Sequence, residues 1–144
     1  MPSQRAIRTL AMAVVLRGAD ILVSQGRDPV KGETFHRLLG GGIEFGEPAE
    51  EALRREMREE IAVELTGVER LGVVENIFVY DGEPGHEIVF LYSATVADPA
   101  FYDRDDLGTV LDEGSPVLWL PLQDVVDGRA ILYPTGVIDL VRPG

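Results

Sequence analysis

Three glutamates are spaced so that they fall on one side of a predicted helix. Glu56, Glu59 and Glu60 follow an i, i+3, i+4 pattern, which places their side chains next to one another on a helix surface. Carboxylates this close repel each other, and a divalent cation would remove that repulsion. Hard oxygen ligands of this kind suit Mg²⁺ or Mn²⁺. The spacing alone also allows a simpler reading, in which the helix presents a solvated acidic surface.

The helix that carries these glutamates is predicted over residues 48–61. It begins with a proline, whose fixed φ and missing N–H suit the first helical turn. Leu53, Met57 and Ile61 share the side that faces the core. Three consecutive glycines at residues 40–42 precede the helix, and they predict a loop with unusual backbone freedom close to the carboxylates.

The rest of the chain alternates apolar runs with turn residues, which places it in the α/β (α+β) class. Strands are predicted over residues 6–17, 21–24, 35–39, 63–65, 71–80, 87–96 and 117–120, and short helices over residues 121–126 and 134–141. This order predicts an α/β/α sandwich, with helices around a mixed β-sheet. A length of 144 residues predicts a single domain over residues 1–144.

Composition excludes several kinds of function. The chain has no cysteine, so it forms no disulfide and uses no thiol catalysis, and it has only two histidines, His36 and His86. A formal net charge of −12 disfavours long nucleic acids as partners. A small anionic substrate remains compatible with this charge if divalent cations neutralise it locally.

The sequence favours a cytoplasmic protein that does not span a membrane. No apolar run approaches the ~20 residues that a transmembrane helix requires. Residues 10–16 form a short apolar stretch between arginines. We interpret this stretch as a buried strand and not as a signal peptide, because its small residues lie inside the stretch and not after it.

Residues 41–63 resemble the Nudix box, whose pattern is G-x5-E-x7-R-E-U-x-E-E-x-G-U, where U is a bulky aliphatic residue. The matching residues here are Gly41, Glu47 and the run Arg55-Glu56-Met57-Arg58-Glu59-Glu60-Ile61-Ala62-Val63. One fixed position departs from the pattern, because Ala62 stands where the family has glycine. The order of the surrounding strands is also similar to that of the MutT-like Nudix hydrolases.

The resemblance implies a metal site in the helix. Glu56, Glu59 and Glu60 would bind Mg²⁺ or Mn²⁺, with the backbone of Gly41 close to the metal. Glu56 could instead orient or deprotonate the attacking water, and in the same way Glu59 counts among the catalytic candidates. Each of these assignments follows from the matching position in the box.

The resemblance also implies residues that hold the helix against the glycine segment. Arg55 would pair with Glu47 or Glu59, and Gly42 would let the backbone turn tightly. Glu44, in the same segment, is a candidate supporting residue, although a solvated position is the favoured alternative.

A further general base is expected outside the box. Glu113 lies in an acidic loop before the strand at residues 117–120, where similar Nudix chains often carry an acid. Glu87, at the start of another strand, is the rival. If neither acts as the base, Glu56 itself remains the candidate.

Three residues are candidate substrate contacts. Arg27 and Lys31 precede the box and could clamp a phosphate, and His86 could contact one as well. Ordinary surface charge, or a surface histidine in a hairpin, is the alternative for each. The strand aromatics at positions 35, 78, 80 and 90 are compatible with core packing, so no nucleobase contact is assigned.

The implied function is Mg²⁺- or Mn²⁺-dependent hydrolysis of a diphosphate linkage in a nucleoside diphosphate linked to another group. ADP-ribose, a nucleotide sugar and a nucleoside triphosphate all remain open as substrates. A Nudix-fold domain that binds nucleotides without hydrolysing them is the alternative function, and a purely structural acidic domain is a third. A homodimer is the default expectation for the assembly.

Overall fold

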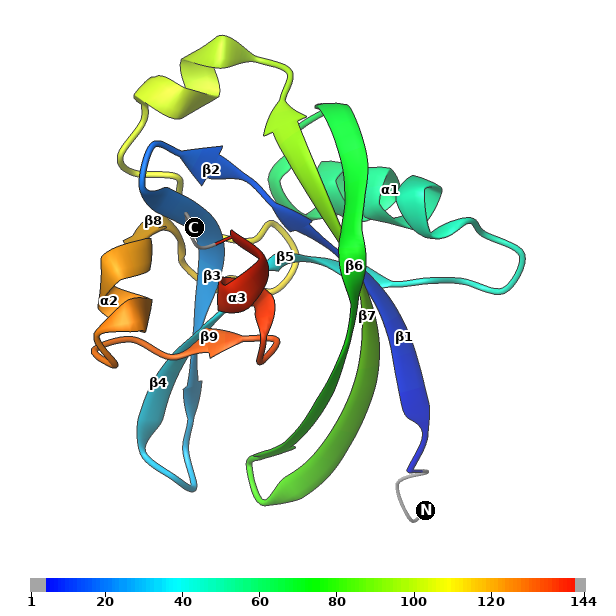
Figure 1. The fold of residues 1–144 in the computed structure, drawn as a ribbon, viewed down its shortest axis with the longest axis vertical. Helices are drawn as coiled ribbons and strands as arrows, with labels where there is room; N and C mark the ends of the chain where they lie inside the picture. The colour runs from blue at the N-terminus through cyan, green and yellow to red at the C-terminus, as the bar shows by residue number, and fades with distance from the viewer. Residues whose placement is uncertain (1–4, 142–144) are drawn as a thin grey trace.

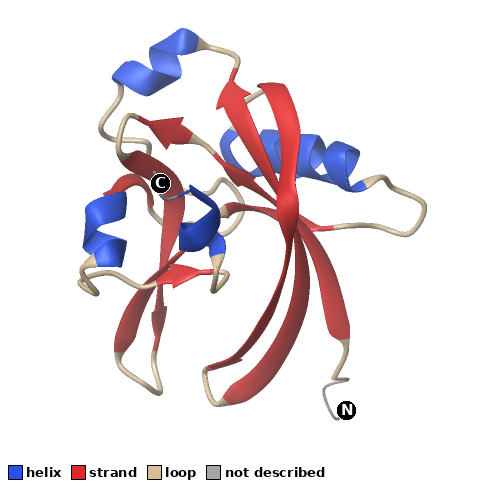
Figure 2. Ribbon diagram, in the orientation of Figure 1, coloured by secondary structure: helices blue, strands red, loops and turns tan. Residues whose placement is uncertain are grey.

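The computed structural model describes residues 5–141, and Figure 1 shows their arrangement. The strands are β1 (Ile7–Val14), β2 (Leu16–Arg17), β3 (Asp20–Asp28), β4 (Glu33–Arg37), β5 (Leu39–Gly42), β6 (Leu65–Tyr80), β7 (Glu83–Val96), β8 (Val117–Pro121) and β9 (Leu132–Tyr133). The helices are α1 (Ala49–Ile61), α2 (Leu122–Val126), α3 (Val137–Val141) and the 3-10 helix η1 (Pro99–Asp103). The strands occupy the middle of the molecule and the helices lie around them (Figure 2).

The strands form two mixed sheets, which confirms the expected mixed α+β class. The first sheet has the order β5-β1-β7-β6, with β1 and β7 parallel and the other neighbours antiparallel. The second sheet has the order β2-β3-β4-β9, with β8 paired to β3. The sequence predicted helices around a mixed sheet, and the strands divide between two such sheets.

Strand β1 separates two hydrophobic clusters. Ala11 and Ala13 belong to the cluster that includes Leu53 of α1, whereas Leu10 and Met12 belong to the cluster on the other face. Successive side chains of a strand point to opposite faces of its sheet. The first sheet is therefore covered by α1 on one face and by the second sheet on the other, and small alanines stand where α1 crosses β1.

The glycine run forms a strand, so the prediction of a loop over residues 40–42 was wrong. Gly40, Gly41 and Gly42 pair antiparallel with Met12, Ala11 and Leu10 as part of the edge strand β5. A Cβ atom at Gly40 would overlap the carbonyl oxygen of Ala11, and the φ of Gly40 is 144°. Glycine is therefore required here for the close approach of two strands.

Several other boundaries differ from the prediction. β3 and β4 continue into the predicted loop over residues 27–33, because their hairpin pairs as far as Asp28 and Glu33. The predicted strand at residues 71–80 is part of one long strand, β6, whose pairing with β7 shifts register twice. Of the strand predicted over residues 63–65, only Leu65 belongs to β6, and the two residues before it are not in a strand. β9 was not predicted, since a strand of two residues carries no periodicity. No helix among residues 5–141 is long and apolar enough to cross a membrane.

Helix α1 ends at an alanine in a left-handed conformation. Ala62 has φ 56° and ψ 41°, and its N–H donates to the carbonyl of Arg58 at 3.0 Å. An L-residue with a Cβ is disfavoured in this region, where glycine is the usual choice.

Ala62→Gly is expected to stabilise the protein by about 1 kcal/mol. The substitution removes the Cβ penalty while the exposed position loses no packing. Urea unfolding of the two proteins measures the difference, with Ala97→Gly, an exposed alanine outside this conformation, as the control that should not gain stability. A decrease for Ala62→Gly would show that α1 does not end in the described way.

Candidate active site

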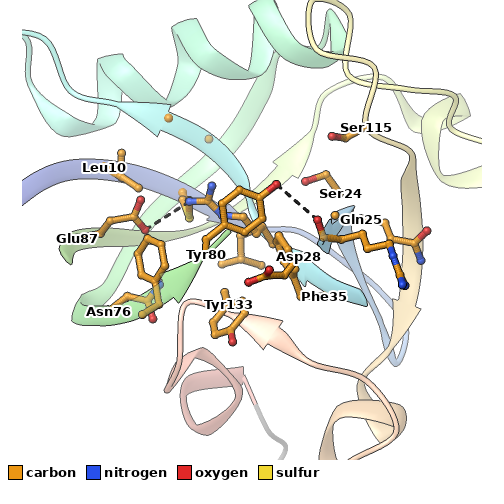
Figure 3. A pocket seen from close by; sticks show the side chains of 18 of the residues that line it. Leu10, Ser24, Gln25, Asp28, Phe35, Asn76, Tyr80, Glu87, Ser115 and Tyr133 are labelled. Atoms are coloured by element: carbon orange, nitrogen blue, oxygen red, sulfur yellow. Dashed lines mark hydrogen bonds and ion pairs between the residues drawn. The ribbon is translucent and has the colours of Figure 1, made fainter. Parts of the chain in front are cut away.

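A cavity of about 590 Å³ lies between the two sheets. Its floor is apolar, with Leu10 and Met12 from the first sheet and Leu38 from the segment between β4 and β5. Its rim is charged and aromatic (Figure 3). The polar residues lining it include Arg27, Lys31, Arg37, Glu60, Glu87 and Glu113.

Edge strand β5 brings α1 to this cavity. Because β5 is the last strand of the first sheet, alternate backbone groups of the strand have no neighbouring strand to bond. The Gly40 N–H donates to Glu60 Oε1 at 2.9 Å, and the Gly42 carbonyl accepts from Arg55 Nη2 at 3.0 Å. Two side chains of α1 therefore take the place of a neighbouring strand.

Arg55 is the centre of a network of charged side chains. Its guanidinium donates to both oxygens of Glu47, at 2.8 and 3.0 Å, and to Glu56 Oε1 at 2.8 Å. A longer contact of 3.3 Å reaches Glu59 Oε2. These hydrogen bonds raise the pKa of Arg55, and the bond from Arg55 lowers the pKa of Glu47. The predicted pairing of Arg55 with Glu47 or Glu59 is thus present with both partners.

Glu60 has a different environment from its neighbours on the helix. Burial raises the pKa of Glu60 to about 8, against the opposing effect of the Gly40 N–H. The negative charges of Glu56 and Asp112 raise it further, whereas Arg37 lowers it. Glu60 lines the cavity. The ionised form of Glu60 is therefore destabilised, and a bound cation would stabilise it.

The carboxyl group of Glu56 lies directly against the backbone of Gly41. A Cβ at Gly41 would overlap the carboxyl group of Glu56, so no other residue type fits here without displacing that carboxylate. Gly41 itself lines the cavity. Packing against the Glu56 carboxylate thus explains why glycine occupies position 41, and no turn is needed to explain it.

The loop before β8 brings further acids to the C-terminal end of α1. The Leu111 N–H donates to the carbonyl of Glu60 at 2.9 Å, which places Asp112 and Glu113 near that end of the helix. Glu113 lines the cavity and accepts a short hydrogen bond from Ser115 Oγ. Asp112 was not predicted as a site residue, and its only signal in the sequence is its place in an acidic loop.

The carboxylates suit a hard divalent cation in type, although they do not converge in this structure. Within residues 5–141, no three acidic or histidine side chains surround one point closely enough to hold a metal ion. Glu56 and Glu59 are drawn to Arg55, and Glu60 is bonded to Gly40. The fit rests on the oxygen-only donor set, on the charge repulsion at Glu60 and on the close approach of the Glu56 carboxylate to the backbone of Gly41.

The other predicted site residues differ in whether they line the cavity. Arg27 and Lys31 line the cavity. His86 is absent from the cavity lining and pairs with Glu75 at 3.2 Å on the opposite face of the first sheet. Glu44 is exposed, with its carboxylate 4.0 Å from Arg55, and its backbone N–H donates to Glu47.

Glu87 lines the same cavity but stands away from Glu60. It is 2% exposed, and its carboxylate contacts Arg8 at 3.6 Å and Arg37 at 3.4 Å. Glu87 lies opposite Arg8, four residues along β1 from Met12, which lies opposite Gly40. Four residues of a strand span about 13 Å, so the two ends of the cavity are well separated.

A buried aspartate that lines the cavity connects two hairpins. Asp28 accepts hydrogen bonds from the backbone N–H groups of Val30, Lys31 and Asp81, at 2.9, 3.1 and 3.2 Å. Burial opposes the ionised form, but these backbone bonds lower the pKa of Asp28 below its ordinary value. Asp81 belongs to the turn between β6 and β7, so Asp28 joins the tips of two hairpins, which lie side by side in Figure 1.

The sequence analysis did not identify three polar residues of the cavity wall. Arg8, Arg37 and Asn76 all line the cavity. Arg8 has the same parity in β1 as Leu10 and Met12, so alternation along that strand was a usable signal. Asn76 is a lone amide in an apolar run, which is a similar signal.

Comparison with known proteins identifies the family. The family model described as NUDIX domain matches residues 7–136. The MutT4 protein of Mycobacterium tuberculosis is 29% identical over 109 residues, which cover 76% of this chain and 42% of that protein. The NAD-capped RNA hydrolase NudC of Pseudomonas putida is 41% identical over 61 residues, which cover 42% of this chain and 21% of that protein. The matches thus span less than half of either relative.

Solved structures share the fold. A MutT NUDIX hydrolase from Burkholderia pseudomallei has a TM-score of 0.68 at 24% identity, covering 95% of this chain and 99% of that chain. A NUDIX hydrolase from Nitrosomonas europaea has a TM-score of 0.66 at 18% identity, covering 94% and 86%. Similarity at this level of identity shows the architecture.

Proposed function

The chain belongs to the Nudix family, and on that premise we propose that it hydrolyses a diphosphate linkage in a small nucleotide with the help of Mg²⁺ or Mn²⁺. The observation that carries this proposal is the state of Glu60. A carboxylate whose pKa is raised to about 8 by burial, and then by its acidic neighbours, faces a cavity lined by Arg27 and Lys31. That arrangement suits a cation and a polyanion bound together.

Glu60, Glu59 and Glu56 are the residues proposed to hold the metal, with the backbone of Gly41 beside them. When bound, the metal would neutralise the diphosphate and lower the pKa of a water molecule. Glu56 and Glu59 would give up part of their contact with Arg55 in exchange. Arg55 keeps its bidentate bond to Glu47 in either case, so α1 and the glycine strand stay joined.

Glu113 is the better candidate for a proton acceptor outside the box. It lies in the loop that contacts the end of α1, on the same side of the cavity as Glu60. Glu87 stands about 13 Å further along the sheet and is held by two arginines. A group that removes a proton from the attacking water has to lie within hydrogen-bond reach of it.

Arg27 and Lys31 are proposed phosphate contacts. Both line the cavity, and the backbone N–H of Lys31 is fixed by Asp28. The hairpin that carries them is therefore held in place before a substrate arrives. Preorganised cations lose less entropy on binding than mobile ones.

A phosphate-release screen tests this function. The protein would be incubated with Mg²⁺ or Mn²⁺, a phosphatase that acts on the products, and a panel of ADP-ribose, nucleotide sugars, nucleoside di- and triphosphates and dinucleoside polyphosphates. We expect turnover of at least one class, and EDTA should abolish it. Folded protein that binds nucleotide but turns over none of the panel would contradict the proposal and favour a binding domain.

A further inference from the structure

A row of polar side chains crosses the first sheet on its cavity face. Arg8 of β1 lies opposite Glu87 of β7, and Glu87 lies opposite Asn76 of β6. Side chains at paired positions of adjacent strands share a face, and all three residues line the cavity. We call Arg8, Glu87 and Asn76 the polar row. The next row on the same face is apolar, with Leu10 opposite Val89.

The carboxylate of Glu87 can accept more hydrogen bonds than the structure gives it. Glu87 is contacted by one nitrogen each of Arg8 and Arg37, whereas an ionised carboxylate offers about four lone-pair sites. A buried ion pair usually adds little stability compared with well-packed apolar residues. The cost of burying the Glu87 carboxylate is therefore better explained by a ligand than by folding.

Asn76 offers the complementary kind of group. Its Oδ1 accepts from the backbone N–H and the hydroxyl of Thr135, at 3.5 and 3.4 Å. With the oxygen engaged, the amide N–H groups are what Asn76 can present to the cavity. Two adjacent strands thus offer an acceptor and a donor side by side.

Aromatic rings form the wall beside the polar row. The ring centroid of Phe35 lies 5.7 Å from that of Tyr80 and 5.8 Å from that of Tyr133, and all three line the cavity. In Figure 3, Tyr80 lies in the middle of the pocket, with Glu87 and Asn76 to one side of it. Flat apolar surfaces of this kind suit a stacked nucleobase.

We propose that the polar row and this aromatic wall form a subsite for a guanine base. The proposal rests on the proposed function, because it positions the base of the same nucleotide. A carboxylate only accepts hydrogen bonds, and guanine presents two adjacent donors on one edge, N1–H and the 2-amino group. The neighbouring O6 is an acceptor suited to the guanidinium of Arg37 or to the amide of Asn76.

The position of the polar row fits a base better than a phosphate. The row lies about 13 Å along β1 from the Gly40 pairing, so a nucleotide with its phosphates near Glu60 can extend its base to Glu87. A phosphate at the row would meet the buried negative charge of Glu87. The charges of the two nearest arginines, Arg8 and Arg37, are partly neutralised by that carboxylate, although their remaining N–H groups can still donate to a neutral acceptor.

Inosine nucleotides provide the test, because hypoxanthine differs from guanine only by lacking the 2-amino group. The affinities of the α,β-methylene analogues of GDP and IDP would be measured by calorimetry in Mg²⁺ buffer. The wild-type protein is expected to bind the GDP analogue about 10- to 100-fold more tightly, since one hydrogen bond to a charged group is lost. This ratio requires no variant, so it stands even if substitutions in the row impair folding.

The variant Glu87→Gln then tests whether Glu87 is the residue that causes the preference for guanine over hypoxanthine. In this variant the ratio of the two affinities is expected to fall close to one, whereas Glu75→Gln, on the opposite face of the same sheet, should keep the wild-type ratio. Equal affinities in the wild-type protein, or an unchanged ratio in Glu87→Gln, would overturn the proposal. The methylene bridge blocks hydrolysis, so a guanine preference without turnover of any nucleotide in the phosphate-release screen would contradict the proposed function alone.

Discussion

Glu60→Gln is expected to reduce turnover by a hundredfold or more while the fold is retained, an order of magnitude typical of removing one charged group from a metal-assisted site. Glutamine has nearly the shape of glutamate and can still accept from the Gly40 N–H, but it no longer offers a charged oxygen to a cation. The measurement is kcat/KM in saturating Mg²⁺ for whichever nucleotide the screen identifies. Glu51→Gln, an exposed position of the same helix, is the matched control and should turn over at the wild-type rate. Wild-type activity in Glu60→Gln would refute the assignment of this ligand.

The same substitution should make the metal-free protein more stable. The pKa of Glu60 is raised to about 8 by burial and by the charges of Glu56 and Asp112, compared with 4.5 for an ordinary glutamate. Below about pH 4.5 both the folded and unfolded states hold the proton, so the residue adds no pH dependence. Between pH 4.5 and about pH 8 the unfolded state releases its proton first, so the free energy of unfolding falls as the pH rises.

Glu60→Gln is therefore expected to gain on the order of 2 kcal/mol over the wild-type protein near pH 8 in EDTA. The gain should shrink steadily toward pH 4.5. Urea titrations at several pH values measure it. A gain that stays constant with pH would indicate that the carboxylate is solvated and not buried, which would remove the main observation behind the proposed function.

Arg55→Ala is expected to destabilise the protein by about 2–3 kcal/mol, because it leaves a set of carboxylates and one carbonyl without their common donor. The Arg55 side chain is 25% exposed and bonds Glu47, Glu56 and the Gly42 carbonyl. Turnover should also fall on the order of tenfold or more, since the helix would no longer be held in place against β5. Chemical denaturation and steady-state kinetics measure the two effects.

Arg58→Ala is the matched control for Arg55. Arg58 lies on the same helix and pairs with Glu64, but its side chain is 52% exposed, and exposed pairs contribute about 0–1 kcal/mol. Arg55→Lys separates charge from geometry, because lysine keeps the charge and loses the bidentate fork. If Arg55→Ala were no more destabilised than Arg58→Ala, the network around Arg55 would not stabilise the fold.

The sequence was informative where the signal is local. Helix α1 was predicted to within one residue, because its core-facing side follows a helical period. Its three glutamates were placed on one side for the same reason. The association of Arg55 with Glu47 came from the resemblance to the Nudix box. Seven residues lie between the two, and Glu47 precedes the helix, so helical periodicity does not relate them.

The sequence was uninformative where pairing between distant strands decides the structure. Residues 40–42 were expected to form a loop because glycine favours flexible backbone, yet their pairing with β1 turns them into an edge strand. The polar row brings together Arg8, Glu87 and Asn76, which are far apart along the chain and adjacent only through the registers of three strands. No local pattern carries that information.

The way Asp28 fastens the two hairpin tips has a consequence for how this protein can evolve. Its carboxylate grips three backbone amides, and every residue type except proline supplies such a group. Side-chain substitutions at Val30 or Lys31, other than to proline, therefore leave these backbone donors available to Asp28. The Arg55 network that holds α1 to β5 involves neither tip. Substitutions at these tips can thus change the groups that face the cavity while α1 stays held against β5.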